Sequence, residues 1–461
     1  MGSIIFIIYA AAVLGASFMA RRQQQGEAGF FLNNRSSSAW AVGASIVVSC
    51  VGASATIGTV GLAFEVGVPA FWWLGSGAVG LSVLALFLAA KVRRTEARTM
   101  PEIVEIFFGP QARRLISVII VAAWLSILAA QFSALSQVTA AMTGLETRAA
   151  LIWGVILVTI HTVSGGQAGV IRLDRWQCLL LIAGLLLTVG WLAGLNHAVL
   201  PAIPIEAVNK QFPAGRLIYF LLIIGGSYVV CPTLFGRLLS AQNEKTARQG
   251  ALGAALGLVI VSAAVVLIGL LARGLVDPAV GGDAVLVGVL EKVFPGWLTL
   301  AVYVVLLSAI VSSADSGLIS AGLVLAHDVF GRKDVKASRL CLTALALGGL
   351  LLSLSGQGIL NYLLMANDIY VCGVVGPVFA GLMWAGNNGD MVPARGLATA
   401  GIAAGGLLGL ISAMTGNIHY SYAGLLASSG LTVFSLKPLG RAPMITRSVK
   451  PPKAPLIQRP H

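Results

Sequence analysis

The sequence predicts an all-α polytopic membrane protein. Hydrophobic residues make up 57% of its 461 positions and charged residues only 10%, whereas a water-facing protein carries about 25% charged residues. The apolar runs are about 20 residues long, which is the length of a helix that crosses a bilayer. This composition excludes soluble enzymes, nucleic-acid-binding modules and disordered chains.

Hydropathy divides the chain into thirteen predicted transmembrane helices. In the outer loop after the eighth, apolar residues near helical spacing predict a short interfacial helix, with Val285, Leu286, Val289, Leu290 and Val293 on its apolar face. The predicted spans are 3–20, 40–64, 69–91, 114–143, 149–165, 174–195, 216–238, 249–273, 297–327, 340–356, 358–385, 396–415 and 419–436.

The basic residues give the orientation. The net charge is +13, and with the amino terminus outside, 25 of the 30 Lys and Arg residues fall on the inner side. The positive-inside rule therefore predicts a cell-membrane protein with a cytoplasmic carboxyl terminus. The basic, proline-rich tail 437–461 is expected to be disordered and to touch anionic lipid headgroups. The five cysteines lie inside apolar runs without paired spacing, so neither disulfides nor a zinc site is indicated.

The densest polar stretch within a span lies between residues 308 and 316. Ala309, Ser312, Ser313 and Ser316 are spaced i, i+3, i+4 and i+7, so three hydroxyls share one helix face. Neutral oxygen ligands suit an alkali cation, and the absence of nearby His or Cys in the sequence argues against a transition metal. The alternative is that this small, hydroxylated face only lets two helices pack closely.

Two other spans carry interruptions. Residues 49–54 place small and polar residues inside the second span, and residues 225–228 followed by Pro232 interrupt the seventh. Interrupted helices at corresponding positions of two halves indicate an inverted-repeat transporter with a site at the membrane midplane. The predicted divisions are an extra amino-terminal helix and inner loop (1–39), a first repeat (40–195), a second repeat (196–385), two further helices (386–436) and the tail (437–461).

Acidic residues within membrane spans are functional candidates. Asp315 and Asp368 lie inside predicted helices, and Asp174 opens one at the inner surface. The alternative for Asp174 is an interfacial charge paired with Arg172 or Arg175. The alternative for Asp315 is a buried partner of a neighbouring helix terminus.

Several of these segments together resemble the sodium:solute symporter family over residues 30 to 436. The strongest matches are the stretch from Ser308 to Ser316 with its continuation to Asp328, and the sequence Pro232-Thr233-Leu234-Phe235-Gly236-Arg237 followed by Ser240, Asn243 and Ala247. Weaker matches lie at 40–58, 99–102, Gln131, 165–166, Asp174 with Gln177, and 361–384.

The resemblance implies thirteen helices with a LeuT-type core of two five-helix inverted repeats. It also implies a main Na⁺ site between the first and eighth core helices, formed by the carbonyls of Val48, Val51 and Ala309 and the hydroxyls of Ser312 and Ser313. Some family members have a second cation site. Here that site would use Asp174, Ser312, Asp315 and Ser316.

The expected solute pocket departs from the better-known subgroups. Ala55 and Leu74 stand where sugar transporters of the family carry amide and acidic groups, and Cys50 stands where proline transporters carry an aspartate. A mostly apolar pocket with hydroxyls, an amide and half-helix ends suits a small carboxylate or an apolar amino acid. For the two tryptophans the alternative is packing or an interfacial belt. The candidates are Cys50, Ser54, Trp72, Trp73, Ser76, Gln131, Ser227, Tyr228 and Cys231.

The sequence therefore predicts a transporter rather than an enzyme, which couples Na⁺ entry to uptake of a small organic solute by alternating access. A proton-coupled symporter is one alternative, because Asp174 and Asp315 could titrate. Another is a membrane sensor, since similar helices occur fused to histidine kinases. Only 25 residues follow Leu436, so a sensor would need a separate signalling partner. A structural scaffold is the third alternative. It ranks last because a scaffold would have no need of the broken helices and serine faces that the sequence contains.

Overall fold

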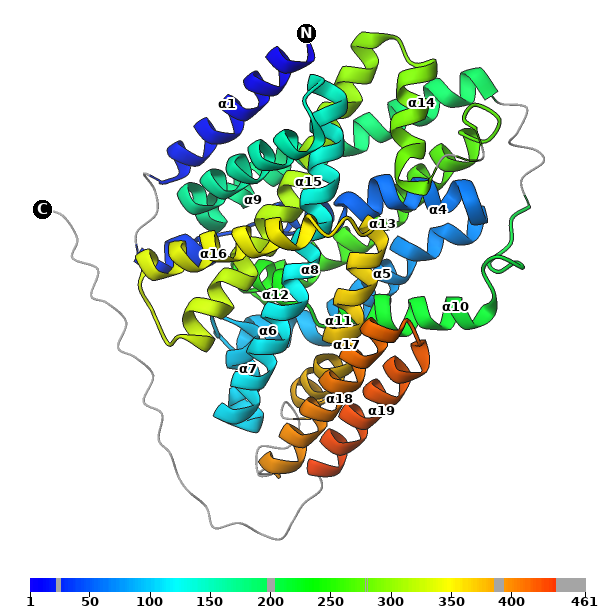
Figure 1. Cartoon of the computed structure of the whole chain (residues 1–461). Coiled ribbons are helices and arrows are strands. Elements are labelled where there is room, and N and C mark those ends of the chain that lie inside the picture. Colours follow the sequence, from blue (N-terminus) through cyan, green and yellow to red (C-terminus); the bar gives the residue numbers. More distant parts are fainter. Residues whose placement is uncertain (22–25, 197–203, 278, 280, 385–393, 437–461) are drawn as a thin grey trace, which may run out of the picture.

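A computed structural model describes the chain apart from residues 22–25, 197–203, 278, 280, 385–393 and 437–461, so the predicted tail lies outside the described residues. The regular elements of the described part are helices (Figure 1). The first nine are α1 (Gly2–Arg21), α2 (Gly26–Leu32), α3 (Ala39–Cys50), α4 (Thr59–Val66), α5 (Trp72–Val83), α6 (Ala89–Arg94), α7 (Met100–Phe108), α8 (Pro110–Thr143) and α9 (Thr147–Asn196).

The second half of the chain is also built from helices, and the predicted interfacial segment forms one of them, α14. These helices are α10 (Ala214–Tyr219), α11 (Gly225–Val229), α12 (Pro232–Leu239), α13 (Glu244–Leu271), α14 (Val285–Val293), α15 (Gly296–Leu323), α16 (Val335–Ser353), α17 (Ile359–Trp384), α18 (Arg395–Thr415) and α19 (Ile418–Ser435).

In the described part of the chain, fewer helical segments qualify as membrane spans than the thirteen predicted. Ten described helical segments are long and apolar enough to cross a membrane, and the bent pair of α3 and α4 makes an eleventh. The counts differ at α9, which contains both predicted spans 149–165 and 174–195, and at α19, which is not among the ten. The all-helical polytopic architecture is thus observed, while thirteen crossings stay a prediction.

The α9 helix is too long to be one straight crossing. Its 50 residues would extend about 75 Å at about 1.5 Å per residue, against a hydrocarbon core of about 30 Å. The chain kinks at Gly166, whose backbone lies at φ 52° and ψ −165°. A Cβ atom there would lie 2.7 Å from the Phe30 ring, so both conformation and space require glycine.

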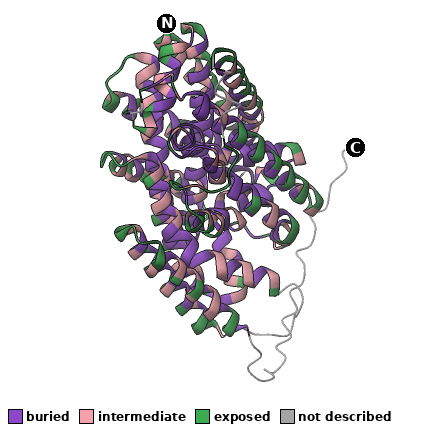
Figure 2. Cartoon of the chain, turned by 90° about the vertical axis from the view of Figure 1, so that its right-hand side faces the viewer, coloured by how far each residue is buried: buried purple, intermediate pink, exposed green. Residues whose placement is uncertain are grey.

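The centre of the molecule is α15, the helix that carries the serine face. Around it lie α8, α9 and α3, and α17 packs on α8. The terminal helices are peripheral: α1 lies on the outside of α9, and α18 and α19 pack on each other and on α17 (Figure 1). Burial follows this arrangement, with buried residues concentrated in the middle helices and exposed residues on the outer faces (Figure 2).

Loops predicted on the same side of the membrane meet in the structure. On the predicted inner side, Ser37 pairs with Ser240 through the backbone, and Arg94 forms an ion pair with Glu244 at 2.7 Å. On the predicted outer side, Arg273 Nε donates to Phe64 O at 2.8 Å and Asp283 accepts from Ile359 N at 3.1 Å. The fold therefore separates the loops into two faces, as a membrane protein requires.

Candidate functional site

The helix formed by α3 and α4 breaks next to the serine face of α15. Helix α3 ends at Cys50, Val51 leaves helical geometry at φ −96° and ψ 64°, and the two parts are bent by 66°. Gln131 Oε1 of α8 accepts a hydrogen bond from the freed Ala53 N–H at 3.0 Å. A Cβ atom on Gly52 would lie 2.5 Å from that Oε1 and 2.6 Å from Ser313 Oγ, so glycine is needed for this close approach.

A second break separates α11 from α12. Val230 and Cys231 are extended, with φ of −131° and −142°, and Pro232 then begins α12. Proline fits the first turn of a helix because its missing N–H would have no partner there. Tyr370 Oη of α17 donates to the freed Val230 carbonyl at 2.7 Å. Both predicted interruptions are thus true breaks, each with a side chain bonded to the unpaired backbone.

The predicted main Na⁺ ligands lie around the first break. Ser313 Oγ is 3.0 Å from the carbonyl oxygen of Val48 and 3.1 Å from that of Ser49. Val51, at the end of α3, and Ala309, on α15, are fully buried. Ser312 turns away from this group and donates to Asp174 Oδ1 at 2.5 Å. A hydroxyl of α15 and carbonyls of the last turn of α3 thus converge beside the break, which is an oxygen set suited to a hard monovalent cation.

The predicted second-site residues lie beside these ligands, with a guanidinium among them. Asp174 is fully buried rather than interfacial, and it accepts hydrogen bonds from Ser45 and Ser312. Arg237 of α12 is 1% exposed. Its Nη2 donates to Ser316 Oγ at 2.5 Å and lies 3.5 Å from Asp174 Oδ2. The sequence matched Arg237 to the family motif without indicating this contact.

Asp315 faces a different set of partners. Its Oδ1 accepts from Thr162 at 2.5 Å, and its Oδ2 lies 2.9 Å from His161 Nε2. His161 in turn contacts Ser17 of α1 through Nδ1. These partners are side chains of α9 rather than a helix terminus. The structure therefore does not bring Asp315 into contact with the other second-site candidates through any described hydrogen bond.

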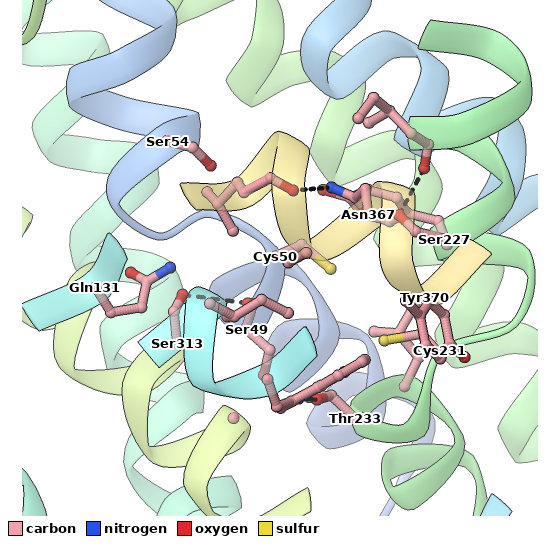
Figure 3. Close-up of a pocket in the computed structure, with 18 of the residues that line it drawn as sticks. Ser49, Cys50, Ser54, Gln131, Ser227, Cys231, Thr233, Ser313, Asn367 and Tyr370 are labelled. Carbon is pink, nitrogen blue, oxygen red and sulfur yellow. Dashed lines mark hydrogen bonds between the residues drawn. The ribbon is translucent and has the colours of Figure 1, made fainter. Parts of the chain in front are cut away.

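A cavity lies between the two breaks (Figure 3). Gln131 and Ser313 lie on one side of it, and Ser227, Asn367 and Cys231 on the other. Seven of the nine predicted solute-binding residues line it. Trp72 and Ser76 do not, because Trp72 packs edge-on against Phe71 and Ser76 is buried with its hydroxyl 3.3 Å from Trp73 O. The lining residues are Ser49, Cys50, Ser54, Trp73, Trp124, Ile127, Gln131, Ile224, Ser227, Tyr228, Cys231, Thr233, Leu234, Ser313, Gly317, Leu363, Ala366, Asn367 and Tyr370.

The cavity is small and uncharged. Its volume of about 120 Å³ is roughly ten times the 10–15 Å³ that one water needs, so it suits a small molecule. Among the described lining residues none is Asp, Glu, Lys or Arg. Trp124, Thr233, Asn367 and Tyr370 were missed by sequence reasoning. Their positions depend on how α8, α12 and α17 pack, and only the polar Asn367 inside an apolar span could have pointed to the site.

Comparison with known proteins defines the class. The model of the Sodium:solute symporter family matches residues 30–385. The chain is 24% identical over 374 residues to a sodium/glucose cotransporter of Vibrio parahaemolyticus, covering 71% of this chain and 68% of the relative. It is also 24% identical over 351 residues to a sodium/pantothenate symporter of Haemophilus influenzae, covering 70% and 71%.

The solved structures agree on the fold. A substrate-bound, outward-open Na⁺-coupled sialic acid symporter superposes with a TM-score of 0.81 at 15% identity, over 94% of this chain and 97% of that one. MhsT in complex with L-phenylalanine gives 0.62 at 16% identity, over 85% and 98%. The fold is therefore LeuT-like, and the family match makes it the fold of a secondary transporter. The chain belongs to the sodium:solute symporter family, and it is a Na⁺-coupled symporter of a small solute rather than an enzyme.

Proposed function

We propose that the protein couples inward Na⁺ movement at the first helix break to uptake of a small carboxylate or apolar amino acid. The observation that carries this proposal is the position of Ser313, whose hydroxyl lies 3.0 Å from Val48 O and also lines the solute cavity. An ion bound at this hydroxyl would hold α3 and α15 together beside the solute. Ion occupancy would thereby favour the conformation that binds solute.

The lining of the cavity supports the class of solute. Trp73, Trp124 and Tyr370 offer apolar faces, while Asn367 donates through Nδ2 to Leu363 O at 2.8 Å and keeps its carbonyl oxygen for a ligand. The first turn of α12, with Thr233 and Leu234, also lines the cavity, and helix N-termini favour anions. Pantothenate, the solute named for one relative, is itself a carboxylate.

The proposed ligands of the main Na⁺ site are Val48, Val51, Ala309, Ser312 and Ser313, as the resemblance implies. The proposed orientation has the amino terminus outside and the carboxyl terminus in the cytoplasm, because the basic residues of the predicted inner loops gather on one face. The proposed division into repeats 40–195 and 196–385 pairs the broken helix α3–α4 with the broken helix α11–α12.

One experiment tests this function. Purified protein in Na⁺ or K⁺ buffer is screened by thermal shift against small carboxylates and apolar amino acids, and the ligands found are used for uptake into proteoliposomes. We expect uptake that requires Na⁺, with Li⁺ as a poor substitute. Equal uptake in choline buffer across a pH series would contradict Na⁺ coupling. Na⁺-dependent binding without any flux would favour the sensor alternative.

A further inference from the structure

Asp368 takes no part in the sites described above, although the sequence marks it as a functional candidate. It lies on α17, nine residues after Ile359, and is therefore about 14 Å along the helix at about 1.5 Å per residue. The side chain is 7% exposed. Within the described part of the chain, no Lys, Arg or His forms an ion pair with it. An intramembrane carboxylate is costly unless it is paired or binds a ligand.

Three hydroxyls hold this carboxylate, but they satisfy its two oxygens unequally. Oδ1 accepts from Tyr219 Oη and from Ser421 Oγ, each at 2.7 Å. The described contact of Oδ2 is with Ser412 Oγ at 3.4 Å, and that hydroxyl has a nearer acceptor in Asn417 O at 3.0 Å. A hydroxyl has one proton to donate. Oδ2 therefore keeps room for a further hydrogen-bond donor.

A cavity adjoins Asp368 on the side of α17 that faces away from the solute cavity. Its volume is about 880 Å³, against about 120 Å³ for the solute cavity. It lies between α10, α17 and the turn from α18 to α19, whose ends meet on the predicted outer side. Asn367 lines the solute cavity and Asp368 lines this one, because successive residues of a helix point about 100° apart. The larger cavity is therefore a separate site of ordinary ligand-pocket size.

The same cavity contains a positive charge, that of Arg216 on α10. Its guanidinium carbon lies 5.3 Å from the centre of the Phe212 ring and 5.8 Å from that of Phe220. Such a contact uses the face of the guanidinium and leaves its N–H donors for an acceptor. Among the described residues it forms no ion pair, with Asp368 or any other acid.

The two charges are held apart by the geometry of α10. Arg216 and Tyr219 are three residues apart, so they share one helix face about one turn from each other. Tyr219 is the residue that reaches Asp368. The rest of the lining is mostly apolar, with Leu364, Met365 and other side chains. The cavity thus offers an unpaired cation and an underused carboxylate oxygen at separate places on an apolar wall.

We propose that this cavity binds a zwitterion, with its primary ammonium at Asp368 and its anionic group at Arg216. A primary ammonium supplies the N–H donors that Oδ2 lacks, and an anion pairs with the guanidinium. Two sources have this chemistry: the headgroup of phosphatidylethanolamine and a free apolar amino acid. The site goes beyond the proposed function, since it requires neither Na⁺ nor the solute cavity.

Native mass spectrometry of purified, delipidated protein tests the lipid source. The probes are phosphatidylethanolamine and phosphatidylcholine with the same acyl chains, because the choline group has no N–H donor. Wild type should bind phosphatidylethanolamine about tenfold more tightly, the scale of one hydrogen bond to a charged group. Asp368→Asn should lose this preference and Asp368→Glu should keep it. Arg216→Gln should weaken both lipids, which share the phosphate, whereas Arg148→Gln, an exposed arginine of α9 outside the cavity, should bind as wild type does.

Isothermal calorimetry with L-leucine tests the free source. Binding that Asp368→Asn weakens about tenfold and Asn367→Ala leaves unchanged would place the amino acid in this cavity, since Asn367 lines the solute cavity. The proposal is overturned if wild type binds the two lipids equally and leucine binding is the same in wild type, Asp368→Asn and Arg216→Gln. If Asp368→Asn folds poorly, the lipid preference of wild type and the Arg216→Gln variant decide. Failure of Na⁺-dependent uptake would contradict the proposed function and leave these measurements unaffected.

Discussion

Ser312 and Ser313 are adjacent in sequence but have different partners. Successive residues on a helix point about 100° apart, so Ser313 reaches the carbonyls at the end of α3 while Ser312 reaches Asp174. Ser313 is therefore the more direct candidate ligand. Ser312 connects the main site to the pair of Asp174 and Arg237.

Replacing Ser313 by Ala should raise the Na⁺ concentration for half-maximal transport by about tenfold, since tenfold corresponds to about 1.4 kcal/mol, the scale of one lost ligand. Ser312→Ala should raise it by a smaller factor. Na⁺ activation of uptake measures both. The matched control is Ser117→Ala, a buried serine of α8 whose hydroxyl, among the described residues, donates to Arg113 O of its own helix. An unchanged Na⁺ dependence in Ser313→Ala would favour the packing interpretation.

Cys231 offers a chemical probe of the cavity. It lies at the second break and lines the cavity, whereas Cys341 is buried on α16 away from it. In a variant that keeps Cys231 as its only cysteine, a transported solute plus Na⁺ should slow alkylation several-fold, because bound solute covers the thiol. A variant with only Cys341 serves as the control and should show no protection. If no transported solute changes the rate of Cys231 alkylation, the solute binds elsewhere.

At the scale of the helix, the break between α3 and α4 depends on one missing side chain. In Gly52→Ala, the new methyl group would collide with Gln131 and Ser313, so the α3 carbonyls should move away from Ser313. We expect loss of Na⁺-dependent thermal stabilisation with the protein still folded. Gly253→Ala on α13 is the matched control, because nothing lies within 4 Å of the added atom. If Na⁺ stabilised both variants equally against heat, the geometry of this break would not be needed for ion binding.

The kink in α9 can be tested in the same way. Gly166→Ala places a side chain at φ 52° and 2.7 Å from the Phe30 ring, so both strain and overpacking should destabilise the fold, by about 1–3 kcal/mol for each cause. Gly190→Ala on the same helix has open space around it and should be neutral. The melting temperature of the purified protein measures the difference. A Gly166→Ala protein as stable as wild type would show that the kink does not require glycine.

For the whole molecule, the number of coupled ions sets the maximum solute gradient. With one Na⁺, a tenfold Na⁺ gradient supplies about 1.4 kcal/mol, and 100 mV adds about 2.3 kcal/mol per charge. These sum to about 3.7 kcal/mol, or roughly 500-fold accumulation of a neutral solute.

Proteoliposomes held at zero potential give a simpler measurement of the ion number. For a tenfold Na⁺ gradient, net flux of a neutral solute should vanish at a tenfold solute gradient if one ion is coupled. A wild-type protein that reverses near a hundredfold gradient would require two ions.

The sequence by itself determined the features that depend on local pattern. Apolar runs of about 20 residues gave the helices, basic residues gave two distinct loop faces, and the spacing of Ser312, Ser313 and Ser316 gave a polar helix face. The helix interruptions at Gly52 and Pro232 could also be predicted from the sequence, because glycine and proline affect the backbone wherever they stand. Hydropathy separated α9 into two spans, and between them the backbone leaves helical geometry at Gly166.

Only the tertiary structure decided which side chains meet. Arg237, Asp174 and Ser316 are far apart in sequence, and their contact depends on how α12, α9 and α15 pack. The same packing brings His161 to Asp315 and Tyr370 to Val230. Periodicity shows which face of a helix is polar, but it cannot show which other face lies opposite. A buried carboxylate therefore has the same sequence pattern whether its partner is a Na⁺ ion or an arginine.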